Sequence, residues 1–174
     1  MSPCAARAAR RWLIDELARL PVELRLNFVF CAANKDEFPA YVEWVAARWP
    51  HAAVTVSFVA ASTDLVPRDR SLVPRYRDVV PPLADGIRRA RAAGLSLTGF
   101  DSMCGLPLCL VPDDLTAALA AALAPIVPGS DGGEFVHTDE CRRCDLVARC
   151  HGIRRGYVAL HGSSELHAIQ RASL

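Results

Sequence analysis

Apolar residues recur with two different spacings along the first hundred residues of the chain. A spacing of three and four residues, typical of one helix face, marks three stretches. Alternate apolar positions, typical of a strand with one covered face, mark two others, and a third strand is short. The predicted order is helix 7–20, strand 24–30, helix 38–49, strand 52–60, helix 82–93 and strand 95–97.

Each predicted element has one apolar side, which we expect to face the core. Pro21 ends the first helix, and four prolines make residues 62–82 loop or short turns. Pro82 is expected in the first turn of the third helix, and Gly94 at its C-terminal cap. The helical stripes are Trp12, Leu13, Leu17 and Leu20; Phe38, Tyr41, Val42, Val45 and Trp49; and Leu83, Ile87 and Ala90.

The alternation of strands and helices predicts the fold class of residues 1–112. Strands separated by helices of about ten residues or more pair in parallel through right-handed crossovers. Three strands are few for a parallel sheet, which is normally larger and covered on both faces. We therefore expect an α/β region that is part of a (β/α) barrel or sheet and is completed by other polypeptide.

The regular alternation of predicted helices and strands ends at residue 101. A loop that contains Gly105 and Pro107 leads into an alanine-rich helix that ends near Pro125, and a glycine-rich linker follows. A short strand over residues 134–137 then precedes a cluster of cysteines. Residues 113–174 are accordingly predicted to form a small Cys-rich extension.

Composition and charge exclude several classes of protein. Of the 174 residues 52% are apolar and 22% charged, and the net charge is +1. So balanced a charge gives no reason to expect binding to nucleic acid or to an acidic membrane surface. The first twenty residues carry charges throughout, so we expect no secretory signal, and no stretch is apolar enough to span a bilayer. The expected location is cytoplasmic.

The strongest chemical signal is the spacing of Cys141, Cys144 and Cys150, which is C-x2-C-x5-C. In a reducing compartment, clustered thiols indicate metal ligands before disulfides. A two-residue gap places two sulfurs in one turn, and the five-residue gap lets the chain return a third. The pattern is typical of zinc or iron–sulfur sites. The other two thiols, Cys4 and Cys31, are expected to be small buried apolar residues.

The fourth ligand is less clear from the residues alone. Cys109 is the best candidate, Cys104 is an alternative five residues before it, and His151 and His137 are weaker ones. Spacing leaves zinc and iron–sulfur nearly even. The absence of a second C-x2-C pair, the usual zinc-ribbon design, favours iron–sulfur. Residues 129–174 hold few large apolar residues, so we expect a metal to supply much of their stability.

Several motifs together resemble a known family. The chain is similar to the C-terminal half of radical S-adenosylmethionine enzymes with a SPASM/Twitch extension, over most of residues 24–170. The resemblance implies an auxiliary [4Fe–4S] cluster held by Cys109, Cys141, Cys144 and Cys150, in peptide or protein modification. The matching pieces are Asn27–Asn34, Thr55–Ala60, Gly105–Cys109, the C-x2-C-x5-C motif with Gly152, Tyr157 and His161–Leu166.

The chain departs from this family in one important respect. It has no C-x3-C-x2-C motif, which in the family binds the cluster that cleaves S-adenosylmethionine. Position 154 is Arg, so only the single-cluster Twitch type fits. The resemblance thus implies no catalytic residues in this chain and no activity alone, unless an N-terminal half is supplied in trans. The alternatives are a structural zinc module at the same cysteines, or a module that binds a peptide at a strand edge.

Overall fold

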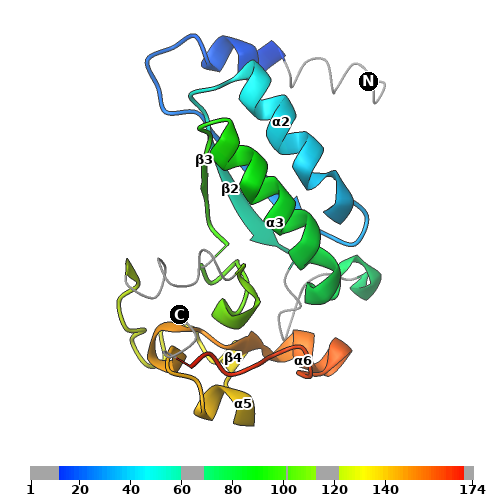
Figure 1. The fold of residues 1–174 in the computed structure, drawn as a ribbon, viewed down its shortest axis with the longest axis vertical. Coiled ribbons are helices and arrows are strands. Elements are labelled where there is room, and N and C mark those ends of the chain that lie inside the picture. The colour runs from blue at the N-terminus through cyan, green and yellow to red at the C-terminus, as the bar shows by residue number, and fades with distance from the viewer. Residues whose placement is uncertain (1–11, 60–68, 101, 113–121, 171–174) are drawn as a thin grey trace.

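The structure is a computed structural model that describes residues 12–59, 69–100, 102–112 and 122–170. It is a mixed α/β fold built on a three-stranded parallel sheet (Figure 1). The strands β1 (Arg25–Phe30), β2 (Ala53–Phe58) and β3 (Ser96–Thr98) lie in that order across the sheet. The predicted parallel α/β class and all three strands are therefore confirmed.

Two long helices, α2 (Phe38–Arg48) and α3 (Tyr76–Ala92), pack side by side over the sheet (Figure 1). The remaining elements are short and lie mostly beyond the carboxyl ends of the strands. They are η1 (Lys35–Glu37), η2 (Arg70–Leu72), η3 (Leu108–Leu110), β4 (Phe135–Val136), α5 (Asp139–Arg142), η4 (Val147–Arg149), β5 (Ile153–Arg154) and α6 (Arg155–His161). β4 and β5 pair in antiparallel fashion.

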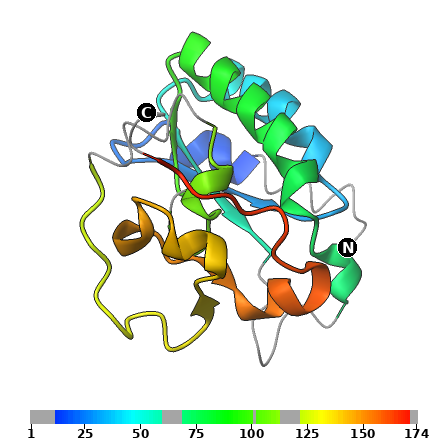
Figure 2. The same cartoon turned by 60° about the horizontal axis from the view of Figure 1, so that its bottom comes forward.

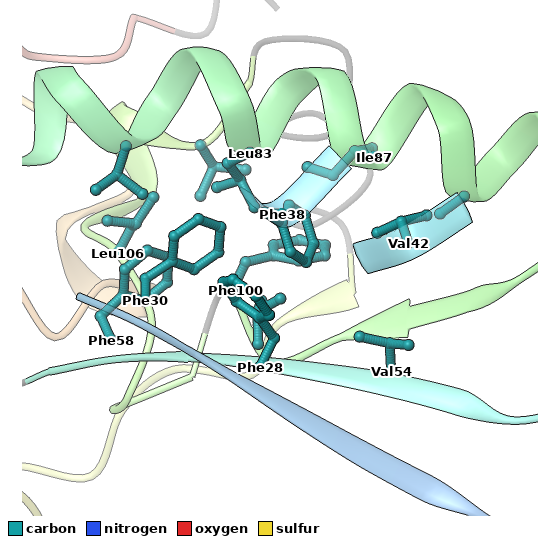
Figure 3. Close-up of a cluster of buried hydrophobic side chains, with 14 of the residues drawn as sticks. Phe28, Phe30, Phe38, Val42, Val54, Phe58, Leu83, Ile87, Phe100 and Leu106 are labelled. Carbon is teal, nitrogen blue, oxygen red and sulfur yellow. The ribbon is translucent and has the colours of Figure 1, made fainter. Parts of the chain in front are cut away.

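The core between the sheet and the helices is rich in aromatic rings (Figure 3). Phe30 lies against Phe28, Phe38 and Phe58, with ring centroids 4.8–4.9 Å apart. Phe38 can pack this closely because α3 presents Gly86, where a Cβ would stand 2.3 Å from the Phe38 ring. The predicted apolar faces of both strands and of both long helices are buried here, as their spacing indicated.

One predicted apolar stripe is not buried. Residues 12–17 are helical, but Trp12, Leu13, Leu17 and Leu20 are 38–63% exposed. Ile14 packs against the core instead. The helix is fixed mainly by polar contacts, because Asp15 pairs with Arg48 (2.5 Å) and accepts the Trp49 indole N–H (3.1 Å). The predicted start of this helix, at residue 7, lies outside the described residues.

The third helix begins earlier than predicted. Tyr76 is its first residue, so Pro81 and Pro82 lie inside the helix and not at its start. Each proline lacks an N–H and so removes one hydrogen bond of the helix, which makes this turn intrinsically less stable. The first turn is stabilised from elsewhere: the Tyr76 N–H donates to the Tyr157 hydroxyl (2.9 Å) and the Arg77 N–H to Glu165 (3.4 Å). Partners 81 and 88 residues away leave no local signal in the sequence.

The two faces of the sheet differ in character. One face carries the buried aromatic and aliphatic residues under α2 and α3. The opposite face is polar: Ser57 donates to Asn27 (3.2 Å), and the Thr55 and Thr98 hydroxyls lie 3.4 Å apart. A parallel sheet is usually covered on both faces. Among the described residues the sheet has three strands, so the expected barrel stays a hypothesis.

The C-terminal region is joined to the α/β region by a shared core. Ile153, Tyr157 and Leu166 are buried in the same apolar cluster as the sheet residues. The Tyr157 ring stacks on Tyr76 at 4.0 Å, and His161 approaches the Val73 carbonyl at 3.1 Å. No described helix is both long and apolar enough to cross a membrane.

Candidate metal centre

The four predicted ligands come from three separate segments of the chain. Cys109 lies in η3 and Cys141 in α5, whereas Cys144 and Cys150 lie on either side of η4. All four line one small void of about 20 Å³, together with Leu108, Val147 and Leu166. The fold thus brings Cys109 to the C-x2-C-x5-C motif across thirty-one intervening residues.

Backbone amides donate to three of the four sulfurs. The Leu108 and Gly152 N–H groups reach the Cys150 sulfur at 3.5 and 3.4 Å. The Ile169 N–H reaches Cys144 at 3.4 Å, and the His167 N–H donates to Cys109. Cys141 has the Thr138 hydroxyl at 3.5 Å. A neutral thiol is a weak acceptor, so this arrangement is better suited to thiolates or to metal-bound sulfur.

The C-terminal segment 166–170 passes directly beside the cysteines. Figure 2 shows it in red, running between η3 and the segment that carries α5 and η4. Besides the two bonds to sulfur, the Asp145 N–H donates to the Ile169 carbonyl (3.0 Å) and the Gln170 amide to the Arg143 carbonyl (2.8 Å). Ile169 packs with Leu108 and Leu146 beside three of the cysteines. An apolar cluster therefore lies beside the cysteines.

Gly152 is required by the same geometry. Its φ of +84° is a conformation that other residues rarely adopt, and a Cβ there would meet the Val136 carbonyl at 2.5 Å. Without a side chain, the backbone can turn sharply after Cys150 and return its N–H to that sulfur. This turn also leads into β5, which pairs with β4 and holds the motif against the core.

Burial controls the protonation of two of the thiols. Burial raises the pKa of Cys109 to about 11, with smaller contributions from the His167 N–H, which lowers it, and from the sulfurs of Cys150, Cys141 and Cys144, which raise it. Burial likewise raises the pKa of Cys150. Without a metal, these side chains are neutral at ordinary pH. A metal must therefore displace protons when it binds.

Of the other candidate ligands, only His137 borders the void among those that the structure describes. Cys104 is exposed and outside the void, and its carbonyl accepts a hydrogen bond from the Phe58 N–H (2.9 Å). Cys31 ends β1 and is partly buried, whereas Cys4 lies outside the described residues. His137 borders the void, but its Nε2 lies 2.9 Å from the Cys150 carbonyl. His151 does not border the void.

The cysteines do not converge on a single point. In the described parts of the chain, no group of three or more His, Cys, Asp or Glu side chains is placed to hold one metal ion. In a tetrahedral zinc–thiolate site with bonds of about 2.3 Å, the sulfurs are about 3.8 Å apart. The four sulfurs surround a common space without closing to such a site.

The contribution of residues 166–170 to the site was not predicted from the sequence. Only the spacing of Leu166 and Ile169 indicated burial. Backbone N–H donors cannot be recognised from the residue types in a sequence. No family model, no curated protein and no solved structure matches the chain. The case for a function therefore depends on the site itself.

Proposed function

We propose that this chain is the C-terminal portion of a radical S-adenosylmethionine protein that binds one auxiliary [4Fe–4S] cluster. Its ligands are Cys109, Cys141, Cys144 and Cys150. The observation that carries the proposal is their meeting round one apolar void, with backbone N–H groups directed at three of the four sulfurs. The cytoplasmic location expected from the sequence agrees with a cluster that needs a reducing compartment.

The arrangement favours a cluster over a single zinc ion. In a [4Fe–4S] cluster each thiolate binds a different iron, so the four sulfurs stand farther apart than round one ion. The absence of a tight group of donors is what this spacing predicts. The present void has room for about one water. A cluster is larger than this void, so the cysteine side chains would have to move to hold one.

The residues of this chain have two roles toward the cluster. The amides of Leu108, Gly152 and Ile169 stabilise negative charge on sulfur, and Leu146 and Ile169 exclude water. Hydrogen bonds to sulfur and solvent exposure are the means by which proteins set a cluster's reduction potential. The cluster, when bound, supplies one-electron transfer or a fixed point for a substrate.

The same chain is not expected to cleave S-adenosylmethionine. Reductive cleavage needs one iron that is free to bind the cofactor, and four protein thiolates leave none. We infer that an N-terminal half, in the same polypeptide or in trans, supplies that cluster and the remaining strands. The polar, uncovered face of the sheet supports this, because the inward face of a barrel that binds a polar cofactor has the same character. The substrate class is a peptide or protein.

Anaerobic reconstitution of the full chain tests the proposal. With iron and sulfide, we expect a brown protein with about four irons per chain. Cys104→Ala is the matched control, because this thiol is exposed and outside the void. A colourless protein that takes up one zinc and no iron would replace the proposal with the structural zinc module. Uptake of neither metal would contradict both.

A further inference from the structure

A second cavity lies on the other side of Cys150 from the void. It measures about 420 Å³, which is large enough for a small organic molecule. One wall is the loop 126–131, drawn in yellow in Figure 2, and the other comprises β4, η4 and the start of α6. The lining residues that matter here are Ile126, Asp131, Phe135, His137, His151 and Arg155.

The cavity is formed by hydrogen bonds that hold its rim. The Ile126 N–H donates to the Ala148 carbonyl at 2.8 Å, which fixes one end of the loop. At the other end, the Asp131 carboxylate accepts the N–H groups of Gly133 (3.3 Å) and Phe135 (3.1 Å). These backbone donors lower the pKa of Asp131. Its negative charge is therefore already stabilised by the loop.

Two neighbouring arginines behave differently at this cavity. Arg154 is fully engaged: it pairs with Glu134, donates to the Met103 carbonyl (2.9 Å) and lies over the Phe135 ring at 4.7 Å. Arg155 uses only its Nε, which donates to the Gly133 carbonyl (2.8 Å). It forms no ion pair with any other residue that the structure describes. Arg155 is an exposed residue that lines the cavity, and its terminal nitrogens donate to no residue that the structure describes.

Two imidazoles add further polar groups to the lining. His137 donates its Nε2–H to the Cys150 carbonyl, because a carbonyl only accepts, and this leaves its Nδ1 as an acceptor. The Nδ1 of His151 is buried and has no hydrogen-bond partner. Among the described residues, it is the only buried side-chain nitrogen or oxygen without one. This nitrogen has almost no accessible surface, so it lies behind the cavity wall and does not face a ligand there.

We propose that this cavity binds a small monocarboxylate with an apolar body. The free guanidinium nitrogens of Arg155 match a carboxylate in two parallel bonds. Phe135, Ile126 and Val147 supply the apolar walls. One arginine and one aspartate balance each other in charge, which disfavours phosphates and other multiply charged ligands. The inference depends on the cavity alone and holds whether or not the cysteines bind metal.

Amide NMR of the full chain with 3-phenylpropanoate tests this assignment. We expect saturable shifts at millimolar concentration, confined to residues 126–137 and 147–155. Arg155→Gln should weaken binding roughly tenfold, as expected for one charge-assisted contact. Arg142→Gln should leave binding unchanged, because Arg142 is exposed and pairs with Asp139.

The neutral 3-phenylpropanamide is the matched probe, and it separates recognition of the carboxylate from simple apolar burial. It should bind at least tenfold more weakly than the acid to the unmodified chain. Equal shifts from acid and amide, shifts elsewhere in the protein, or no saturable binding would each overturn the proposal. Because this comparison needs no variant, it decides the question even if Arg155→Gln fails to fold.

Discussion

The two halves of this molecule are stabilised in different ways. The α/β half has a continuous apolar core in which Phe30, Phe38 and Val54 are completely buried. The cysteine-bearing half has three anchors in that core, Ile153, Tyr157 and Leu166, and otherwise a small cluster of Leu108, Leu146 and Ile169. Apolar burial scales with area, so the second half gains far less from it. Its backbone N–H groups instead donate hydrogen bonds to the cysteine sulfurs.

The structure of each half is therefore determined by different groups of the chain. The first half is specified by side chains whose spacing any reader of the sequence can follow. The second half is specified by four cysteines and by amides that meet them from three segments. The proposed cluster would order such a region when it binds. Substitutions should therefore have different consequences on the two sides of this boundary.

The largest effect is expected at the cysteine motif. Cys144→Ala should abolish cluster binding, because it removes one sulfur of the C-x2-C pair and the Ile169 N–H loses its acceptor. Iron and sulfide analysis measures this, and Cys31→Ala is the control. Hydrogen exchange should rise in residues 139–150 and 166–170 while the sheet stays protected. Full iron content in Cys144→Ala would mean that the ligands are wrongly assigned.

A matched pair of cysteines tests how the two halves are connected. Cys109→Ala should reduce cluster affinity by roughly ten- to a hundredfold or more, whereas Cys104→Ala should have no effect. The reason is position, since Cys109 lines the void and Cys104 is exposed outside it. Titration with a chelator after reconstitution measures the difference. The reverse ranking would transfer the fourth ligand to Cys104, and no effect from either would indicate His151 or an outside ligand.

In the α/β half, the corresponding change is Phe38→Ala. Phe38 is fully buried against Phe28, Phe30 and Gly86, so its removal leaves a cavity at the centre of the core. The expected loss is about 3–5 kcal/mol of unfolding free energy, with or without metal. Denaturant unfolding of both forms measures it. A loss that appears only in the metal-free protein would contradict the separation of the two halves.

The smallest effect is expected at the junction. Tyr157→Phe removes the hydroxyl that accepts the Tyr76 N–H and donates to Glu165, and should cost about 1–2 kcal/mol. Burial and then the Glu165 bond raise the pKa of Tyr157. The folded protein thus keeps this proton to higher pH than the unfolded chain, and stability falls as pH rises above about 10. The unfolding free energy, measured from pH 8 to 11, should fall less steeply in Tyr157→Phe than in the unmodified chain. Equal slopes would exclude this tyrosine as the cause of the pH dependence.

The sequence predicted the α/β half well because its signals are local. The stripe from Phe38 to Trp49 and the alternation from Val54 to Phe58 each indicate one buried face, and both were found. The exposed stripe at Trp12 and the early start of α3 show where local signals fail. Asp15 and Tyr157 fix these segments through partners that are distant in the chain.

The candidate site was predictable only in its side chains. The spacing of Cys141, Cys144 and Cys150 indicated a site. The fold places Cys109 at the void and leaves Cys104 exposed, and Cys109 as the fourth ligand stays a prediction. The donors to sulfur could not be predicted, because every residue except proline has the same N–H. The cavity beside Arg155 was missed for a related reason. Adjacent arginines look alike in a sequence, and only their partners distinguish them.

The most direct test of the central claim is a Mössbauer spectrum of the full chain, reconstituted with isotopically enriched iron. A cluster held by four cysteines should give nearly equivalent iron sites, and added S-adenosylmethionine should not change them. Reduced protein should form no 5′-deoxyadenosine from the cofactor. A distinct iron site that shifts when the cofactor is added, or turnover above the cluster-free control, would show an open cluster. Cys141, Cys144 and Cys150 would then be a catalytic centre and not an auxiliary one.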